Sequence, residues 1–283
     1  LPVLAIVLWL AIERALRPLR TLGRQVAHRA PDNLGAIEVG GAPAEVAPLV
    51  GDLNRLFARV RASIDNERRF TADAAHELRT PLAAIRAQAQ VARGATADAE
   101  RTHALDGVIA GCDRATHLVD QLLTLARLEP ERFLANRKPV ELRAIARDAV
   151  RDIAPLGLAR SVDVVLADGP AVPMHADARL LGILLRNLLD NAVRYSPAHS
   201  AVRLRVGMRD QVAFMAVEDA GPGVPAEVRE ELGQRFRRFA GADTAGTGLG
   251  LSIVKRIAEL HGAQVAFDAA PAGGLAVTVS FSA

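Results

Sequence analysis

Three side chains in the run Phe-Thr-Ala-Asp-Ala-Ala-His-Glu-Leu-Arg-Thr-Pro-Leu, residues 70–82, have the types and spacing to act on phosphate. On a helix, Glu77 is the neighbour of His76, and Thr80 follows one turn later on the same side. A carboxylate beside an imidazole holds one ring nitrogen as N–H and raises the nucleophilicity of the other, as attack on a γ-phosphate requires. We predict that His76 accepts phosphate, that Glu77 is its base, and that Thr80 orients a water toward a phosphorylated partner of His76 for the reverse, phosphate-removing reaction.

A second group of polar side chains falls on one face of a predicted helix over residues 177–196. Asn187 and Asn191 are one turn apart, and Arg194 follows them. A single asparagine there would more often be a satisfied polar residue, but two beside an arginine favour a function. Because amide oxygens are hard ligands, we predict that Asn187 and Asn191 bind Mg²⁺ in a nucleotide site.

Two glycine-rich segments complete the predicted site. Asp219, Gly221 and Gly223 follow a predicted strand, where the aspartate can accept a hydrogen bond from an adenine amino group and the glycines let a base approach the main chain. Alone, this pattern is also a common turn. Residues 246–250, Gly-Thr-Gly-Leu-Gly, open a predicted helix whose first N–H groups suit phosphate, although they form neither a P-loop nor a Rossmann fingerprint. The irregular stretch between the two segments is typical of an active-site lid, in which Arg238 would contact the γ-phosphate.

Composition limits the class of protein that carries these groups. The 283 residues suffice for about two domains, and 50% hydrophobic with 24% charged residues is an ordinary globular mixture. A formal charge of +3 without a concentrated basic face argues against a nucleic-acid partner. The single cysteine, Cys112, excludes an internal disulfide, and its place in a helical pattern predicts a small core residue.

The segment 1–12 is uninterrupted apolar sequence, followed by Glu13 and by arginines at 14, 17 and 20. It is shorter than the about 20 residues that span a bilayer. We expect it to be the end of a transmembrane helix, with the arginines placing the following residues on the cytoplasmic side. The alternative is a buried helix of a soluble protein.

Apolar residues spaced by three and four predict a series of helices after this segment. Residues 12–26 and 46–60 form two such stretches, separated by a break at 31–35, and their narrow apolar seams predict a parallel dimeric bundle. The second stretch continues through the histidine run. Pro81 should bend or loosen the helix there, or be tolerated without consequence.

The chain should then turn near residues 93–98 and return as a helix that ends at 129–130. The predicted seam of this helix comprises Leu105, Val108, Cys112, Ala115, Val119, Leu122 and Ala126. A hairpin of two amphipathic helices cannot enclose a core by itself, so two chains should form a four-helix bundle.

From residue 139 onward, β-branched runs alternate with helical stretches, which predicts a separate α/β domain. The predicted strands include residues 162–166, 202–206, 212–217 and 277–281. Their alternation of polar and apolar residues favours a mixed sheet with one face covered by helices. His261 is assigned a structural role, for want of neighbouring acids or ligand spacing.

In this order, the motifs resemble those of sensor histidine kinases of two-component systems over nearly the whole chain. The phosphoacceptor box matches residues 70–82, the asparagine box 187–196, the first glycine box 219–223, the phenylalanine box 235–238 and the second glycine box 246–251. Pro18 and Glu45 fit a HAMP linker. Two residues depart from the pattern: Gly233 stands where the phenylalanine box often has its first aromatic residue, which would loosen the lid, and Arg194 replaces a common lysine.

The resemblance implies a fold of α plus α/β class, in which a membrane-proximal helical linker and a dimeric four-helix bundle precede an α/β sandwich that binds ATP. The implied domains are 1–12, the end of a transmembrane helix; 13–66, the HAMP linker; 67–130, the dimerisation and histidine phosphotransfer hairpin; and 138–283, the catalytic ATP-binding domain. The implied nucleotide-binding residues are Asn187, Asn191, Arg194, Tyr195, Asp219, Gly221, Gly223, Arg238, Gly246, Thr247, Gly248, Leu249 and Gly250.

The resemblance further implies a homodimer in the inner membrane that autophosphorylates His76 from Mg-ATP, with these domains in the bacterial cytoplasm. It would pass the phosphoryl group to an aspartate of a response regulator and act as a phosphatase in the off state. Two other classes stay open: an ATPase of the same superfamily that moves a clamp without phosphorylating itself, and a signalling scaffold without activity. The histidine box argues against the first, and the intact nucleotide residues argue against the second.

Overall fold

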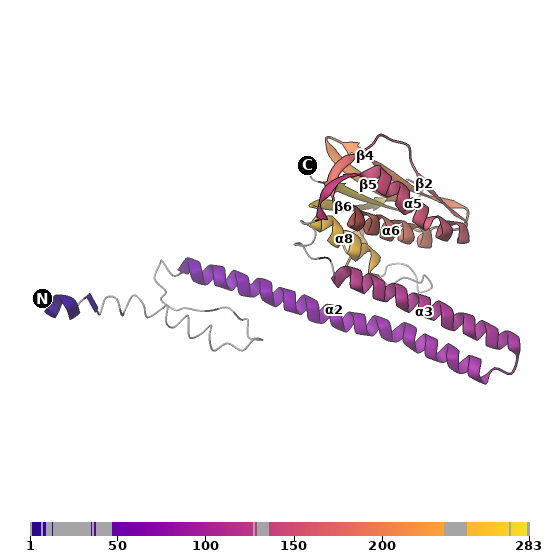
Figure 1. Ribbon diagram of the computed structural model, residues 1–283, viewed down its shortest axis with the longest axis horizontal. Helices are drawn as coiled ribbons and strands as arrows, with labels where there is room; N and C mark the ends of the chain where they lie inside the picture. The colour runs from indigo at the N-terminus through magenta and orange to yellow at the C-terminus, as the bar shows by residue number, and fades with distance from the viewer. Residues whose placement is uncertain are drawn as a thin grey trace. The chain divides into compact units, whose positions relative to one another are not determined.

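The structure, a computed structural model, describes residues 2–6, 8, 9, 13, 35, 37, 47–126, 128, 136–234, 248–271 and 273–281 (Figure 1). The chain divides into two units, Leu1–His76 and Glu77–Ala283. None of the helices in the described part of the chain has the length and apolar content of a membrane span. The predicted linker helix at 12–26 and the break at 31–35 fall almost entirely outside the described residues.

The first unit contains a small apolar cluster at the start of helix α2 (Ala47–Gly94). Ile37 is buried and packs with Val50, Leu53 and Phe57. The carboxamide of Asn54 binds both main-chain groups of Ile37: the Ile37 N–H donates to Oδ1 at 2.7 Å, and Nδ2 donates to the Ile37 carbonyl oxygen at 3.1 Å. Two hydrogen bonds and a buried side chain therefore hold this residue on α2.

Helix α2 runs without interruption for 48 residues and carries Pro81 inside it, so the predicted continuation through the histidine run is confirmed. Helix α3 (Asp98–Ala126) returns along α2 after a short turn (Figure 1). Asp98 and Glu100 lie in the first turn of α3, where negative charge suits the positive end of the helix dipole.

The face of α3 that is buried in the single chain differs from the predicted seam. Its buried residues are Ala104, Gly111, Leu118 and Gln121. Leu105, Cys112 and Val119 were predicted to be buried, but all three are exposed in the single chain. The interpretation of Cys112 as a core residue is therefore wrong for the single chain.

Two glycines explain why α3 turns this face toward α2. A Cβ added at Gly111 would lie 2.5 Å from Cγ1 of Ile85, and one added at Gly107 would lie 3.1 Å from Cγ and Cδ of Gln88. The absence of these carbons lets the two helices approach closely. Four large apolar side chains of α3 remain exposed in the single chain: Leu105, Ile109, Val119 and Leu123.

Substituting Gly111 with alanine is expected to destabilise the hairpin by about 1–3 kcal/mol, because a β-branched side chain such as Ile85 has little freedom to move away from the added carbon. The matched control is Gly182 in helix α6 (Ala178–Tyr195), where an added Cβ meets nothing within 4 Å. Gly182→Ala should stabilise by about 0.4–1 kcal/mol. Urea unfolding of both variants tests the pair, and equal effects would refute the close packing at Gly111.

The second unit holds a mixed five-stranded sheet in the order β2-β4-β5-β7-β6, in which β2 and β4 are parallel and the other neighbours antiparallel. Its elements beyond α3 are β1 (Lys138–Glu141), α5 (Leu142–Ala159), β2 (Val162–Leu166), β3 (Pro173–Ala176), α6, β4 (Ser200–Arg209), β5 (Val212–Glu218), α7 (Ala226–Arg229), α8 (Gly250–Leu260), β6 (Ala263–Ala269) and β7 (Leu275–Phe281). Strands β1 and β3 form a separate antiparallel ribbon. The predicted mixed sheet is confirmed.

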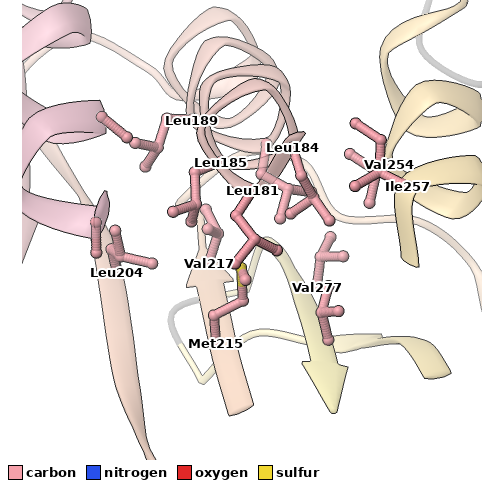
Figure 2. Close-up of a cluster of buried hydrophobic side chains, with 14 of the residues drawn as sticks. Leu181, Leu184, Leu185, Leu189, Leu204, Met215, Val217, Val254, Ile257 and Val277 are labelled. Atoms are coloured by element: carbon pink, nitrogen blue, oxygen red, sulfur yellow. The ribbon is translucent and has the colours of Figure 1, made fainter. Parts of the chain in front are cut away.

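One face of the sheet is covered by helices, as predicted. Alternate residues of the central strands, such as Leu204, Met215 and Val277, point to this face and are buried. Figure 2 shows them beneath a row of leucines from α6 and beside Val254 and Ile257 from α8. Helix α6 therefore packs into the core through its leucines. This packing sets the positions of the half-buried Asn187 and Asn191 on the same helix.

The ends of α6 and α8 are joined by a buried histidine. Asp177 caps α6, and its carboxylate accepts from the main-chain N–H groups of Arg179 and Leu180. His261 accepts from the Asp177 N–H through Nε2 at 3.3 Å, while Nδ1 donates to the Ile257 carbonyl oxygen at 2.8 Å. Both ring nitrogens thus serve a structural role in the neutral ring, which agrees with the assignment from sequence.

Burial lowers the pKa of His261, and Arg137 adds to this, although the Ile257 carbonyl and Asp177 act in the opposite direction. An unfolded histidine binds its proton near pH 6.5, whereas the folded one binds it only at lower pH. The domain should therefore keep its full stability above about pH 6.5 and lose stability as the pH falls below it. Thermal unfolding at about pH 7.5 and 5.5 tests this. His261→Asn should show a smaller loss than the unmodified chain, and an identical loss would exclude His261 as the cause.

Candidate active site

The predicted phosphoacceptor group lies on α2. His76 and Thr80 are exposed and Glu77 is half-buried. Helical spacing places Thr80 one turn after His76. The imidazole is therefore accessible to a phosphoryl donor.

Asp219 directly follows β5 and supplies the carboxylate of the predicted nucleotide site. It is 6% exposed, and its Oδ1 accepts from the N–H groups of Gly221 at 2.9 Å and Leu275 at 3.0 Å. Burial raises the pKa of Asp219, although these two hydrogen bonds lower it. Both N–H groups bind Oδ1, so they fix the orientation of the Asp219 carboxylate.

The main chain around Asp219 is packed so closely that only glycine fits. A Cβ at Gly274 would overlap both the carbonyl oxygen and Oδ1 of Asp219. One at Gly221 would lie 2.7 Å from the Tyr195 carbonyl oxygen, and one at Gly223 would lie 2.8 Å from the Gly273 carbonyl oxygen. The first glycine segment therefore packs closely against the main chain at the end of α6 and just before β7.

Leu275 and Gly274 were not identified from the sequence as part of this site. They lie more than fifty residues after Asp219, and the antiparallel pairing of β5 with β7 brings them together. A signal that could have indicated them is the Gly273-Gly274 pair, two residues before the predicted strand at 277–281.

The asparagine face of α6 meets the start of α8. Asn187 donates through Nδ2 to the Ile183 carbonyl oxygen at 2.8 Å, and its Oδ1 faces Gly250, where an added Cβ would lie 3.3 Å away. Asn191 is half-buried one turn later. The amide oxygen of Asn187 is thus turned toward the helix end that was predicted to bind phosphate.

Helix α8 begins in a way that suits an anion. Leu249 occupies its N-cap position and is fully buried, and its apolar side chain supplies no capping oxygen to the first N–H groups. Gly248 has a φ of +69°, a conformation that favours glycine. N–H groups at a helix N-terminus bind phosphate without further charged residues.

The end of α6 brings two more predicted residues to the site. Arg194 Nε binds Asp190 Oδ2 at 2.7 Å, so its charge is partly balanced. The Tyr195 carbonyl oxygen is covered by Gly221, and the next residue, Ser196, accepts through Oγ from the Ala220 N–H at 3.4 Å. Arg238, Gly246 and Thr247 lie outside the described residues.

Comparison with known families assigns the three parts of the chain separately. The family model for the His Kinase A (phospho-acceptor) domain matches residues 66–131. The model for histidine kinase-, DNA gyrase B-, and HSP90-like ATPases matches residues 176–283, and that for the PhoQ-like sensor protein HAMP domain matches residues 16–62.

Individual proteins resemble the chain along most of its length. The sensor protein QseC of Salmonella typhimurium is 44% identical over 99% of this chain and 62% of its own length. The sensor protein BasS of Escherichia coli K12 is 38% identical over 90% of this chain and 69% of its own length. The crystal structure of full-length ShkA in complex with AMPPNP is 25% identical, with a TM-score of 0.55 over 76% of this chain and 45% of that one.

The chain spans less than two thirds of the length of the QseC relatives. It nevertheless carries the linker, phosphoacceptor and ATPase families in one order, and it matches BasS over more than two thirds of that protein. The chain therefore belongs to the sensor histidine kinases of two-component systems.

Proposed function

We propose that the chain binds Mg-ATP and transfers the γ-phosphoryl group to its own His76. The observation that carries this proposal is the buried Asp219 carboxylate, whose Oδ1 is fixed by two N–H groups in a glycine-lined turn. Such a carboxylate, with its other oxygen available, suits an adenine amino group. ShkA, a structural neighbour, is described in complex with AMPPNP, which supports an adenine nucleotide as the ligand.

The transfer step exchanges one bond to phosphorus for another. An imidazole nitrogen of His76 attacks the γ-phosphorus, and the bond to the β,γ-bridging oxygen breaks as ADP leaves. Glu77 holds the other ring nitrogen as N–H and takes its proton as the phosphohistidine forms. Catalysis would consist mainly of positioning and charge stabilisation. Thr80 would orient the water for the reverse, phosphate-removing reaction.

The residues around α8 fit a magnesium-bound triphosphate. Asn187 Oδ1 is an uncharged oxygen donor that faces the helix N-terminus, and Asn191 lies one turn away. Mg²⁺ takes few protein ligands and completes its shell with phosphate and water, and it would neutralise phosphate charge here. Gly248, Leu249 and Gly250 would hold phosphate oxygens, together with Arg194, Arg238, Gly246 and Thr247, while Tyr195, Gly221 and Gly223 would line the base.

We further propose that two chains form the bundle. Apolar residues of α2 and α3 are exposed in the single chain: Leu82, Leu105, Ile109, Val119 and Leu123. A row of this size on a helical hairpin is typical of a contact with a second copy. We propose the domain limits 1–12, 13–66, 67–130 and 138–283, under which this row would belong to the hairpin.

Membership of the family supports the remaining parts of the proposal. The chain would lie at the inner membrane, anchored through the apolar segment 1–12, with its described domains in the cytoplasm. Phosphohistidine would donate to an aspartate of a response regulator, and the same chain would remove that phosphate in the off state.

Incubation with γ-labelled ATP and Mg²⁺ tests the central proposal. We expect label on the protein that is lost in acid and survives base, as phosphohistidine requires. ATP hydrolysis without label on the protein would instead support the clamp ATPase. A chain that neither takes up label nor hydrolyses ATP would support the scaffold.

A further inference from the structure

The turn that ends at Gln234 rests on a side chain from α8. Gly233 has a φ of +81°, and a Cβ added there would lie 2.6 Å from Cδ and 2.7 Å from Cε of Lys255. The methylene stem of Lys255 therefore occupies the space in which a side chain at position 233 would stand. The neighbouring Leu232 is buried in the main core, so the turn is fixed on its other side as well.

The charged end of Lys255 reaches across to the sheet. Its Nζ lies 5.4 Å from the centre of the Phe267 ring, on β6, which is an edge strand. A cation over an aromatic face contributes about 0.5–1 kcal/mol at an exposed site. One half-buried side chain thus contacts the turn with its stem and the sheet edge with its ammonium group.

This contact bears on the departure of Gly233 from the family pattern, which on sequence alone was expected to loosen the following segment. The space that a Cβ at position 233 would occupy is filled by the Lys255 side chain from α8. The structure describes the chain up to Gln234 and again from Gly248, and α8, on which the turn rests, begins at the proposed phosphate site, Gly248–Gly250.

We propose that Lys255 is a positioning residue for the nucleotide reaction: it holds the turn at residues 229–234 on α8 by filling the space beside Gly233, and Phe267 holds its ammonium group. Lys255 acts through the turn and does not itself bind the nucleotide. The link to ATP rests on the proposed function, whereas the anchoring of the turn is independent of it.

Three variants separate the stem from the charge. Lys255→Ala removes both, Lys255→Met keeps the stem, and Arg256→Ala is the matched control, because Arg256 pairs with Glu259 on the exposed side of the same helix. For Lys255→Ala we expect the apparent KM for ATP in autophosphorylation to rise about threefold to tenfold, with kcat changed less. Lys255→Met should restore most of the affinity, and Arg256→Ala should match the unmodified chain.

Hydrogen exchange at the Leu232 and Gln234 amides is the readout that does not depend on ATP, since these groups donate to Arg229 and Glu231 within the turn. Lys255→Ala should speed their exchange while the amides of β7 remain protected. Unchanged exchange at both amides would overturn the anchor itself. Faster exchange with an unchanged KM would overturn the link to ATP, and an unmodified chain that takes no label would overturn only the proposed function.

Discussion

Replacing His76 with glutamine is expected to abolish labelling by γ-labelled ATP while leaving nucleotide affinity unchanged. Glutamine keeps a polar side chain on the exposed face of α2 but offers no nucleophilic nitrogen to the phosphorus. The nucleotide residues belong to the α/β domain, which has its own core, so binding should be unaffected. Autoradiography and equilibrium binding of a fluorescent ATP analogue measure the two quantities.

The matched control is His103→Gln, because His103 is also an exposed histidine of the helical hairpin. This variant should take up label at the normal rate. Glu77→Gln should slow labelling by about 10²–10⁴-fold, the usual contribution of a general base, without moving it to another residue. Label that persists in His76→Gln at the normal level would refute the assignment of the phosphoacceptor.

Replacing Asp219 with asparagine is expected to lower the affinity for ATP by about 10- to 100-fold without unfolding the domain. Asparagine Oδ1 can still accept from Gly221 and Leu275, but its NH₂ group then stands where Oδ2 was. Two donors, the side-chain amide and the adenine amino group, would face each other. A purine with an oxygen in place of that amino group should lose less affinity, and titration with ATP and GTP compares the two.

The same substitution should leave the stability of the domain at pH 7 equal or higher. Since burial raises the pKa of Asp219, the folded state binds its proton more tightly than the unfolded state does. The carboxyl group therefore favours folding at low pH, and that contribution is lost as the pH rises from about 3.8 through the folded-state pKa. Asp268→Asn, on an exposed part of β6, is the control for the loss of one charge. A large fall in the unfolding temperature of Asp219→Asn alone would contradict this account.

Helix α6 shows what the sequence determines most completely. A helix was predicted within residues 177–196, and the structure places it at Ala178–Tyr195 with Asp177 and Ser196 as its caps. The capping aspartate and the run of leucines at helical spacing are local signals that agree with the final packing. The same holds for β2, whose predicted limits at 162 and 166 are those observed.

The seam predicted for α3 is not the face that packs on α2 in the single chain, and the reason is physical. A helix in a bundle has one face toward its own chain and another toward a partner, and both repeat with the same period. The face with larger side chains, including Leu105 and Val119, looked more like a core than the face with Gly107 and Gly111. Glycines that let a neighbouring helix pack closely add no apolar side chain to the sequence pattern, so this face was not recognised.

Contacts between segments that are distant in the chain could not be predicted from the sequence either. The closeness of Asp219 to Gly274, of His261 to Asp177, and of Gly233 to Lys255 depends on sheet pairing and helix packing. Residue type indicated that Asp219 could bind a base, but its orientation comes from a strand more than fifty residues away.

If two chains form the bundle as proposed, the exposed apolar residues of α3 make the stability of the hairpin depend on protein concentration, unlike that of the α/β domain. The α/β domain buries its apolar residues within one chain, so its folding does not depend on how many molecules are present. The hairpin leaves Leu105, Ile109 and Leu123 exposed in the single chain, so in the proposed dimer its stability would increase with protein concentration by mass action. In that case the abundance of the protein would set the fraction of chains with a paired hairpin, whereas the α/β domain would fold in each chain alone.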